Sequence, residues 1–269
     1  MDKEKQTKDK VEVSEEKNFW YHLEELRGCL IRIFVVVFVA GVAAFCFKET
    51  MFNVILAPCH SNFMTYRWLG VDAFDLHLIN TGLAEQMMIH LKTAMCVGLL
   101  AASPYVLYVL FGFISPALYE NERRYSRQIT LSAYLTFLVG ILLNYLFFFP
   151  LTVHFLGLYQ VSPDIDNMLT ISSYVDTLLL MSLAFGIVFE IPVLAWLLAK
   201  LHLMKAVWMS QYRRHAIVAI LIIAAVITPT TDPFTLIIVS LPIWFLYEIS
   251  IWIVKKGEQS GVKEGIQGS

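Results

Sequence analysis

Long apolar segments alternate with polar connections along the whole chain. Spanning a bilayer as a helix takes about 20 mostly apolar residues. Six segments meet or approach this length, at 28–47, 93–118, 129–149, 174–199, 216–228 and 234–254. The pattern predicts an all-α, polytopic membrane protein with six transmembrane helices.

Prolines lie inside or at the end of several of these segments. Pro104 lies inside the second segment and Pro192 inside the fourth. Because proline removes a backbone donor and clashes with the preceding turn, both helices are predicted to be kinked. Pro150 is predicted to end the third helix.

The fifth segment, 216–228, is unusually short. Its 13 residues would extend roughly 20 Å as a helix, whereas the hydrocarbon core is about 30 Å thick. Either the bilayer thins locally there, or the helix continues into its flanking loops.

Polar segments flank the membrane domain, which is predicted to cover residues 19–254. Residues 1–18 are lysine-rich and have no apolar core of a signal peptide. They are predicted to form a disordered cytoplasmic tail, as are residues 255–269.

The composition agrees with a membrane location. Hydrophobic residues make up 58% of the chain and charged residues only 16%, against about 25% charged in a typical soluble domain. Such a chain must present apolar surface to a lipid bilayer. The net charge of −2 gives no reason to expect a nucleic-acid partner.

The distribution of basic residues predicts the orientation. Lysine and arginine gather before the first segment, after the second, after the fourth and after the sixth, whereas the opposite side carries few, namely Lys48, Arg67 and Lys92. Because basic residues are enriched in cytoplasmic loops, both termini are predicted to lie in the cytoplasm.

The segment before the first apolar stretch has helical periodicity. Phe19, Leu23, Leu26 and Leu30 recur at spacings of four, three and four, which predicts an amphipathic helix at the cytoplasmic interface. From periodicity alone, the charged residues of this segment are a solvated face.

Four sequence motifs resemble those of the TatC family. They are HLEELR (22–27), SPALYENERR (115–124), AFGIVFEIPV (184–193) and TPTTDPFTLIIVSLPIWFLYEI (228–249). They occur in the family's order and span most of the chain. The resemblance implies the core receptor of the Tat export system, which binds twin-arginine signal peptides of folded proteins and assembles the translocation complex using the protonmotive force.

The resemblance also implies the signal-peptide site. Glu25 and Glu122 correspond to glutamates implicated in receiving the two arginines. Leu26 and Arg27 belong to the same N-terminal motif, and Phe113 to the same patch. The chemistry is sound, because a guanidinium matches a carboxylate bidentately, so two arginines call for two carboxylates.

The loop that carries Glu122 contains other charged residues. Glu120 is an alternative second carboxylate. Arg123 and Arg124 would repel a twin-arginine ligand, so their expected role is to anchor the topology.

Glu190 lies deep inside the fourth apolar segment. An acidic residue at the centre of a transmembrane helix costs about 2.5–3.5 kcal/mol on insertion scales, which makes it a functional-site hypothesis. The family resemblance implies contact with the polar region of a partner Tat helix. The structural alternative is a hydrogen bond to another span, with Asn144 as a possible partner.

Two more residues are assigned from the resemblance. Asp232 lies in a rigid outer turn between Pro229 and Pro233, where turn chemistry alone would explain it, but the family's aspartate at this turn is implicated in function. Pro58 is expected to shape the first outer loop.

The alternative function is a small solute or proton transporter using Glu190. Such a transporter would show internal repeats, and none is evident. Neither HExxH nor GxSxG is present, so no enzyme, metal or cofactor is expected. The resemblance implies precursor proteins, single-span subunits of TatA or TatB type and further copies of the chain as partners, in a bacterial inner membrane.

Overall fold

The protein is almost entirely helical. The computed structural model describes residues 2–60, 62–70, 76–114, 126–159, 162, 168–200, 203–228 and 232–267. In chain order the elements are α1 (Asp2–Phe45), α2 (Lys48–Leu56), η1 (Ala57–Cys59), α3 (Met64–Leu69), β1 (Leu78–Ile79), α4 (Glu85–Ile114), α5 (Ser126–Leu143), η4 (Asn144–Phe148), α6 (Phe149–Leu158), β2 (Leu169–Thr170), α7 (Ile171–Val188), α8 (Ile191–Lys200), α9 (Ala206–Gln211), α10 (Arg213–Ile227) and α11 (Pro233–Gln267). The all-α prediction is confirmed.

Five helical segments of the described chain are long and apolar enough to cross a membrane, so the protein is a multi-pass membrane protein. They are Leu23–Phe45, Glu85–Phe113, Ile129–Leu158, Ile171–Lys200 and Pro233–Glu258. The remaining candidate, α10, has 15 residues and is about 22 Å long. The sixth crossing therefore stays a prediction, although α10 starts before the expected segment.

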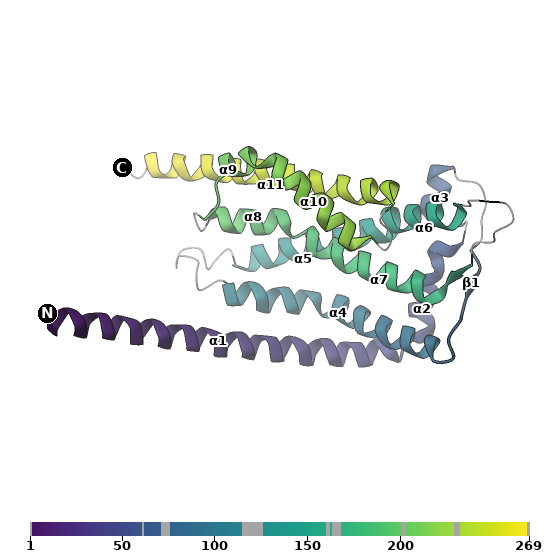
Figure 1. Ribbon diagram of the computed structural model, residues 1–269, viewed down its shortest axis with the longest axis horizontal. Helices are drawn as coiled ribbons and strands as arrows, with labels where there is room; N and C mark the ends of the chain where they lie inside the picture. Colours follow the sequence, from purple (N-terminus) through teal and green to yellow (C-terminus); the bar gives the residue numbers. More distant parts are fainter. Residues whose placement is uncertain are drawn as a thin grey trace.

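The long helices lie side by side along one axis of the molecule (Figure 1). Both chain ends lie at the same end of this bundle, at the left of the view, and α10 runs back along α11 toward the other end. This path fits the predicted arrangement, in which both termini share one side of the membrane.

The structure gives helix where disordered tails were predicted. α1 begins at Asp2 and α11 continues to Gln267. Residues 2–18 contain no glycine or proline and are rich in lysine and glutamate, which are good helix formers. α1 is also continuous into its membrane span, so residues 19–30 do not form a separate helix lying along the interface.

The third span does not end at Pro150. The chain passes from α5 through the π-helical turn η4 into α6, with Pro150 in the first turn of α6. Proline cannot donate to the carbonyl four residues earlier, which here belongs to Leu146. The Thr65 hydroxyl of α3 donates to that carbonyl instead, so a side chain replaces the missing backbone donor.

Two other prolines are compensated in the same way. Pro58 cannot donate to the carbonyl of Val54, which instead accepts from the Ala57 N–H and from the Tyr145 hydroxyl, at 2.6 Å from the latter. Pro104 lies inside the continuous helix α4, where Ser103 Oγ donates to the Leu100 carbonyl at 2.7 Å. Satisfying freed carbonyls is essential where no water is available.

The predicted first outer loop is largely structured. It contains α2, η1, α3 and β1, and β1 pairs in parallel with β2 of the second outer segment, Leu78 opposite Leu169. The Tyr174 hydroxyl of α7 donates to the Ile55 carbonyl at 2.9 Å. Together these contacts cover one end of the bundle.

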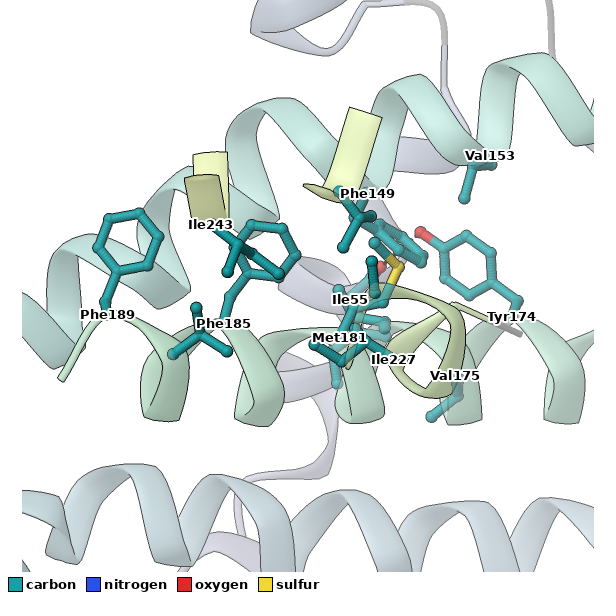
Figure 2. Packing of buried hydrophobic residues seen from close by; sticks show 14 of the residues in the cluster. Ile55, Phe149, Val153, Tyr174, Val175, Met181, Phe185, Phe189, Ile227 and Ile243 are labelled. Atoms are coloured by element: carbon teal, nitrogen blue, oxygen red, sulfur yellow. Dashed lines mark hydrogen bonds between the residues drawn. The ribbon is translucent and has the colours of Figure 1, made fainter. Parts of the chain in front are cut away.

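The main core lies where α7 packs against α2, α6, α10 and α11 (Figure 2). Phe149 and Tyr174 meet edge to face with centroids 5.0 Å apart, and Met181 and Phe185 are buried beside them. Edge-to-face geometry is a preferred aromatic arrangement. This core fixes α7, which carries the chain to Glu190.

Candidate functional site

Glu190 occupies a break in the fourth span, between α7 and α8. Pro192 has no N–H to donate to the carbonyl of Val188. The turn before it is closed by a hydrogen bond between residues three apart, as in a 3₁₀-helix. The Glu190 N–H donates to the Ile187 carbonyl at 3.0 Å, and the Leu194 N–H donates to the Glu190 carbonyl at 2.9 Å, which restarts the helix. The predicted kink of this span is a short interruption centred on the acidic residue.

Two glycines bring α5 against α7 just before the break. A Cβ on Gly140 would lie 2.7 Å from the Phe185 carbonyl oxygen, and a Cβ on Gly186 would lie 2.6 Å from the Phe137 ring. The helices can approach this closely only because both positions lack a side chain. The approach places α5 directly beside the Glu190 break.

The Glu190 side chain is buried without a conventional partner. It is 7% exposed, and neither carboxyl oxygen makes a hydrogen bond of good geometry. The Thr136 hydroxyl approaches the carboxyl, and the same hydroxyl donates to the carbonyls of Ser132 and Ala133, at 3.0 and 2.9 Å. An unsatisfied buried carboxyl is costly and marks a candidate for an external partner.

Asn144, the possible partner for Glu190 in the structural alternative, pairs with another residue instead. Asn144 Nδ2 donates to Ser182 Oγ at 3.0 Å, and both side chains are buried. This bond joins η4 to α7. Sequence patterns did not indicate it, because nothing local relates two residues 38 positions apart.

Glu190 lies in an apolar groove of about 380 Å³ between α4, α5, α7 and α8. Ile187 and Leu194 are exposed on either side of it, so the groove opens on the outer surface of the bundle. Its lining is otherwise apolar except for Ser103, and comprises Leu99, Ser103, Val106, Leu107, Leu110, Phe111, Phe137, Leu183, Ile187, Glu190 and Leu194.

The residues of the N-terminal motif lie on α1. Glu25 and Arg27 are exposed and Leu26 is half-buried, as is Phe113 near the end of α4. The two charged side chains are thus accessible, while the two apolar ones are partly covered.

Leu26 and Phe113 lie at the same level of the bundle. α1 and α4 run antiparallel (Figure 1) and cross where Gly41 meets Gly98. Leu26 precedes Gly41 by 15 residues and Phe113 follows Gly98 by 15 residues. At 1.5 Å per residue, both lie about 22 Å from the crossing on the same side. The two parts of the predicted signal-peptide site therefore share one end of the molecule.

Glu122 lies outside the described residues, as do Glu120, Arg123 and Arg124. Their expected roles stay predictions.

Asp232 caps the N-terminus of α11. Its Oδ2 accepts a hydrogen bond from the Thr235 N–H at 2.7 Å, the bond that an aspartate N-cap makes. This geometry supports the turn-chemistry explanation.

Pro58 is buried in η1, and its carbonyl accepts a hydrogen bond from Tyr66 at 2.9 Å. Both residues belong to the end cap, the elements α2 to β1 within 48–79 that cover one end of the bundle. Burial raises the pKa of the Tyr66 hydroxyl, which keeps it protonated as a donor.

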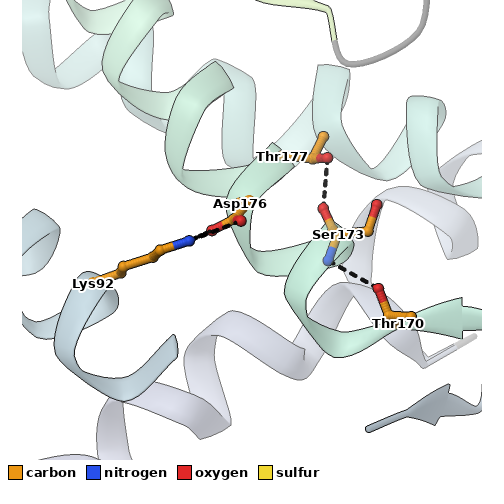
Figure 3. A network of polar contacts seen from close by, with 5 residues as sticks. All are labelled: Lys92, Thr170, Ser173, Asp176 and Thr177. Carbon is orange, nitrogen blue, oxygen red and sulfur yellow. Dashed lines mark hydrogen bonds and ion pairs between the residues drawn. The ribbon is translucent and has the colours of Figure 1, made fainter. Parts of the chain in front are cut away.

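An ion pair joins α4 to α7. Lys92 of α4 bonds both oxygens of Asp176 of α7, at 3.0 and 3.1 Å (Figure 3). Beside it, Thr170 caps α7 by accepting from the Ser173 N–H at 3.2 Å. The sequence placed Lys92 on the side opposite the termini but did not indicate its partner.

A second ion pair joins α10 to α11. Arg213 Nη2 lies 2.9 Å from Glu248 Oε2. The bond ties the start of α10 to the middle of α11.

Within the part of the chain that the structure describes, no three His, Cys, Asp or Glu side chains gather as a metal site. The four cysteines are free.

Comparison with known proteins gives a consistent result. The family model described as Sec-independent protein translocase protein (TatC) matches residues 21–242. The Sec-independent protein translocase protein TatC of Blattabacterium sp. subsp. Periplaneta americana (strain BPLAN) is 32% identical, over 88% of this chain and 96% of that protein. That of Koribacter versatilis (strain Ellin345) is 36% identical, over 88% and 84%.

The fold matches as well. A crystal structure of the twin-arginine translocase receptor TatC superposes with a TM-score of 0.74 at 32% identity, covering 87% of this chain and 97% of that one. A second crystal structure of the receptor gives 0.75 at 31% identity, covering 87% and 99%. These matches give no support to a solute transporter, and the family is one of translocase subunits rather than enzymes. The chain belongs to the TatC family of Sec-independent protein translocase proteins.

Proposed function

We propose that the protein is the receptor subunit of a Tat translocase, which binds twin-arginine signal peptides of folded precursor proteins and assembles the translocation complex. The observation that carries the proposal is the match over most of the chain to TatC proteins, whose solved structures are described as twin-arginine translocase receptors. Transport would use the protonmotive force.

The signal-peptide site lies at the end of the bundle that holds Leu26 and Phe113. Glu25 is accessible there on α1 and offers one carboxylate to a guanidinium, and Glu122 supplies the second. An exposed ion pair contributes only about 0–1 kcal/mol. Most of the affinity must therefore come from burying the apolar part of the signal peptide, at about 25 cal/mol per Å². Leu26 and Phe113 begin an apolar surface for it.

The Glu190 groove receives the transmembrane helix of a single-span subunit of TatA or TatB type. An apolar groove that opens on the bundle surface fits an apolar helix, and the buried carboxyl fits one polar side chain on that helix. A polar contact between helices in a membrane contributes about 1–2 kcal/mol. Glu190 would then gain the hydrogen bond that it lacks in the isolated chain.

The protein lies in a bacterial inner membrane with both termini in the cytoplasm. The positive-inside bias supports this orientation, and the two chain ends share one end of the bundle. In this orientation Glu25 faces precursors before export.

Site-specific photo-crosslinking tests the receptor function. A photoreactive amino acid replaces Glu25, Phe113 or Glu122 in the full chain in membranes, and a twin-arginine precursor or its twin-lysine variant is added. We expect crosslinks with the twin-arginine form and at least about ten-fold fewer with the twin-lysine form. A probe at Lys48, at the opposite end of the bundle, is the control. Equal crosslinking of both precursors, or none at the three site positions, would refute the assignment.

A further inference from the structure

The short helix α3 is anchored to the bundle by one face. The Thr65 hydroxyl donates to the Leu146 carbonyl, and the Tyr66 hydroxyl lies 2.9 Å from the Pro58 carbonyl and 3.1 Å from the Pro150 carbonyl. Thr65 and Tyr66 are both buried. Because these two neighbouring side chains hold α3, the residues on its other face have a defined position.

The same contacts place α3 at the edge of the hydrocarbon layer. The third membrane span begins at Ile129. Leu146 and Pro150 follow Ile129 by 17 and 21 residues, so they lie about 26 and 32 Å along the span, whereas the hydrocarbon core is about 30 Å thick. α3 lies at the end of the bundle away from the chain termini (Figure 1). Its outward face is therefore at the level of the lipid headgroups on that side.

This outward face is exposed, and it combines apolar side chains with a cation. Met64 is 71% exposed and Trp68 is 80% exposed, and residues four apart lie on the same face of a helix. Arg67, between them, is also exposed. Together with Asn62, these three residues line one surface hollow of about 430 Å³, so the four lie side by side.

The Arg67 guanidinium is not neutralised by the protein. Among the residues that the structure describes, no carboxylate forms an ion pair with it. Asp176, at the same end of the bundle, pairs with Lys92 instead. A guanidinium offers a planar fork of N–H donors that matches a phosphate bidentately. The hollow is therefore suited to an anionic group.

We propose that the outward face of α3 binds the headgroup of an anionic phospholipid. Arg67 binds the lipid phosphate, and the Asn62 amide donates to the polar headgroup beside it. Trp68 and Met64 lie against the upper acyl chains, at the depth where tryptophan is enriched in membrane proteins. A lipid fits better than a soluble anion, because only a lipid covers the two apolar side chains as well as the charge. This site lies at the opposite end of the bundle from Leu26 and Phe113.

Lipids with brominated acyl chains test the site, because bromine quenches tryptophan fluorescence at short range. The full chain is reconstituted in phosphatidylcholine vesicles that contain a minor fraction of phosphatidylglycerol, with bromine on one lipid or on the other. Subtracting the spectrum of W68F from that of the wild type isolates the signal of Trp68. We expect phosphatidylglycerol to quench this signal about five-fold more strongly per lipid than phosphatidylcholine, as one basic residue at an anionic surface allows.

Two matched variants locate the preference, each measured with and without W68F. R67Q should abolish the preference for phosphatidylglycerol. K48Q should keep it, although it removes the same charge from an exposed position of α2 at the same end of the bundle. Both substituted side chains are exposed, so neither change should disturb the fold.

Four results would overturn the proposal. The first is equal quenching per lipid by the two lipids in the wild type. The second is an unchanged preference in R67Q, and the third is an equal loss in K48Q, which would indicate general surface charge. The fourth is suppression of the preference by soluble glycerol phosphate at the concentration of the phosphatidylglycerol, which would indicate a free-anion site. If neither lipid quenches Trp68, the proposal also fails, and an acidic protein segment becomes the ligand that fits the hollow.

Discussion

Gly41 of α1 and Gly98 of α4 meet backbone to backbone. A Cβ on Gly98 would lie 2.4 Å from the Gly41 nitrogen and 2.5 Å from its Cα. No side-chain movement can relieve an overlap with backbone atoms. The crossing therefore fixes the register of α1 on α4, and with it the common level of Leu26 and Phe113.

Replacing Gly98 by alanine should destabilise the protein. We expect a loss of about 1–3 kcal/mol in the free energy of unfolding, the usual cost of overpacking, measured by thermal unfolding in detergent. Gly112→Ala is the matched control on the same helix, because a Cβ there meets no atom within 4 Å and alanine favours helix over glycine. A G98A protein as stable as G112A would contradict the close crossing.

Tyr66→Phe should loosen the end cap formed by residues 48–79. The Tyr66 hydroxyl lies 2.9 Å from the Pro58 carbonyl and 3.1 Å from the Pro150 carbonyl, so the variant removes a buried donor that these two carbonyls share. We expect a cost of about 1–3 kcal/mol, seen as a lower unfolding temperature and as faster hydrogen exchange in α3. Tyr108→Phe, at an exposed position of α4, should change neither. No difference between the two variants would refute the role of this hydroxyl.

The sequence was most informative where the structure depends on local composition. Apolar segments of sufficient length predicted the long helices, because a bilayer imposes that length. Pro192 correctly indicated the interruption near Glu190. The prediction from Pro150 was wrong. It assumed that a proline ends a helix because its nitrogen cannot donate a hydrogen bond. Here the Leu146 carbonyl finds another donor, the hydroxyl of Thr65, which lies 81 residues away in the sequence.

The same distinction applies to the candidate site. The sequence predicted Glu190 as a candidate site because it is an acidic residue in an apolar segment. The groove around it could not be predicted, because it forms only where α4 and α5 pack against the break. The pairing of Asn144 with Ser182 and of Lys92 with Asp176 joins residues that no sequence spacing relates. These contacts depend on tertiary packing alone.

Glu190→Leu should stabilise the isolated chain and impair its function. Both carboxyl oxygens lack a hydrogen-bond partner of good geometry, so removing them should raise the free energy of unfolding by about 1–3 kcal/mol. The same change removes the polar group offered to the partner helix. We expect a higher unfolding temperature, weaker co-purification of the single-span subunit and loss of export. Sites selected for function are often poor for stability.

Two variants sharpen that result. Glu190→Gln keeps the shape and hydrogen-bonding capacity of the side chain and should retain part of the partner binding. Glu49→Leu, at an exposed position of α2, should leave partner binding and export intact. Normal export by the Glu190→Leu protein would rule out the proposed contact.

Asp232 offers a test that separates capping from a direct role in transport. Its carboxylate accepts from the Thr235 N–H, and asparagine caps helices about as well as aspartate, whereas alanine costs about 1 kcal/mol. We expect Asp232→Ala to lower the unfolding temperature and Asp232→Asn to restore it. If capping is the whole role, export follows stability through the series. Export that is lost in the Asn variant at wild-type stability would show that the negative charge itself is required, because the two side chains differ in charge and hardly in shape.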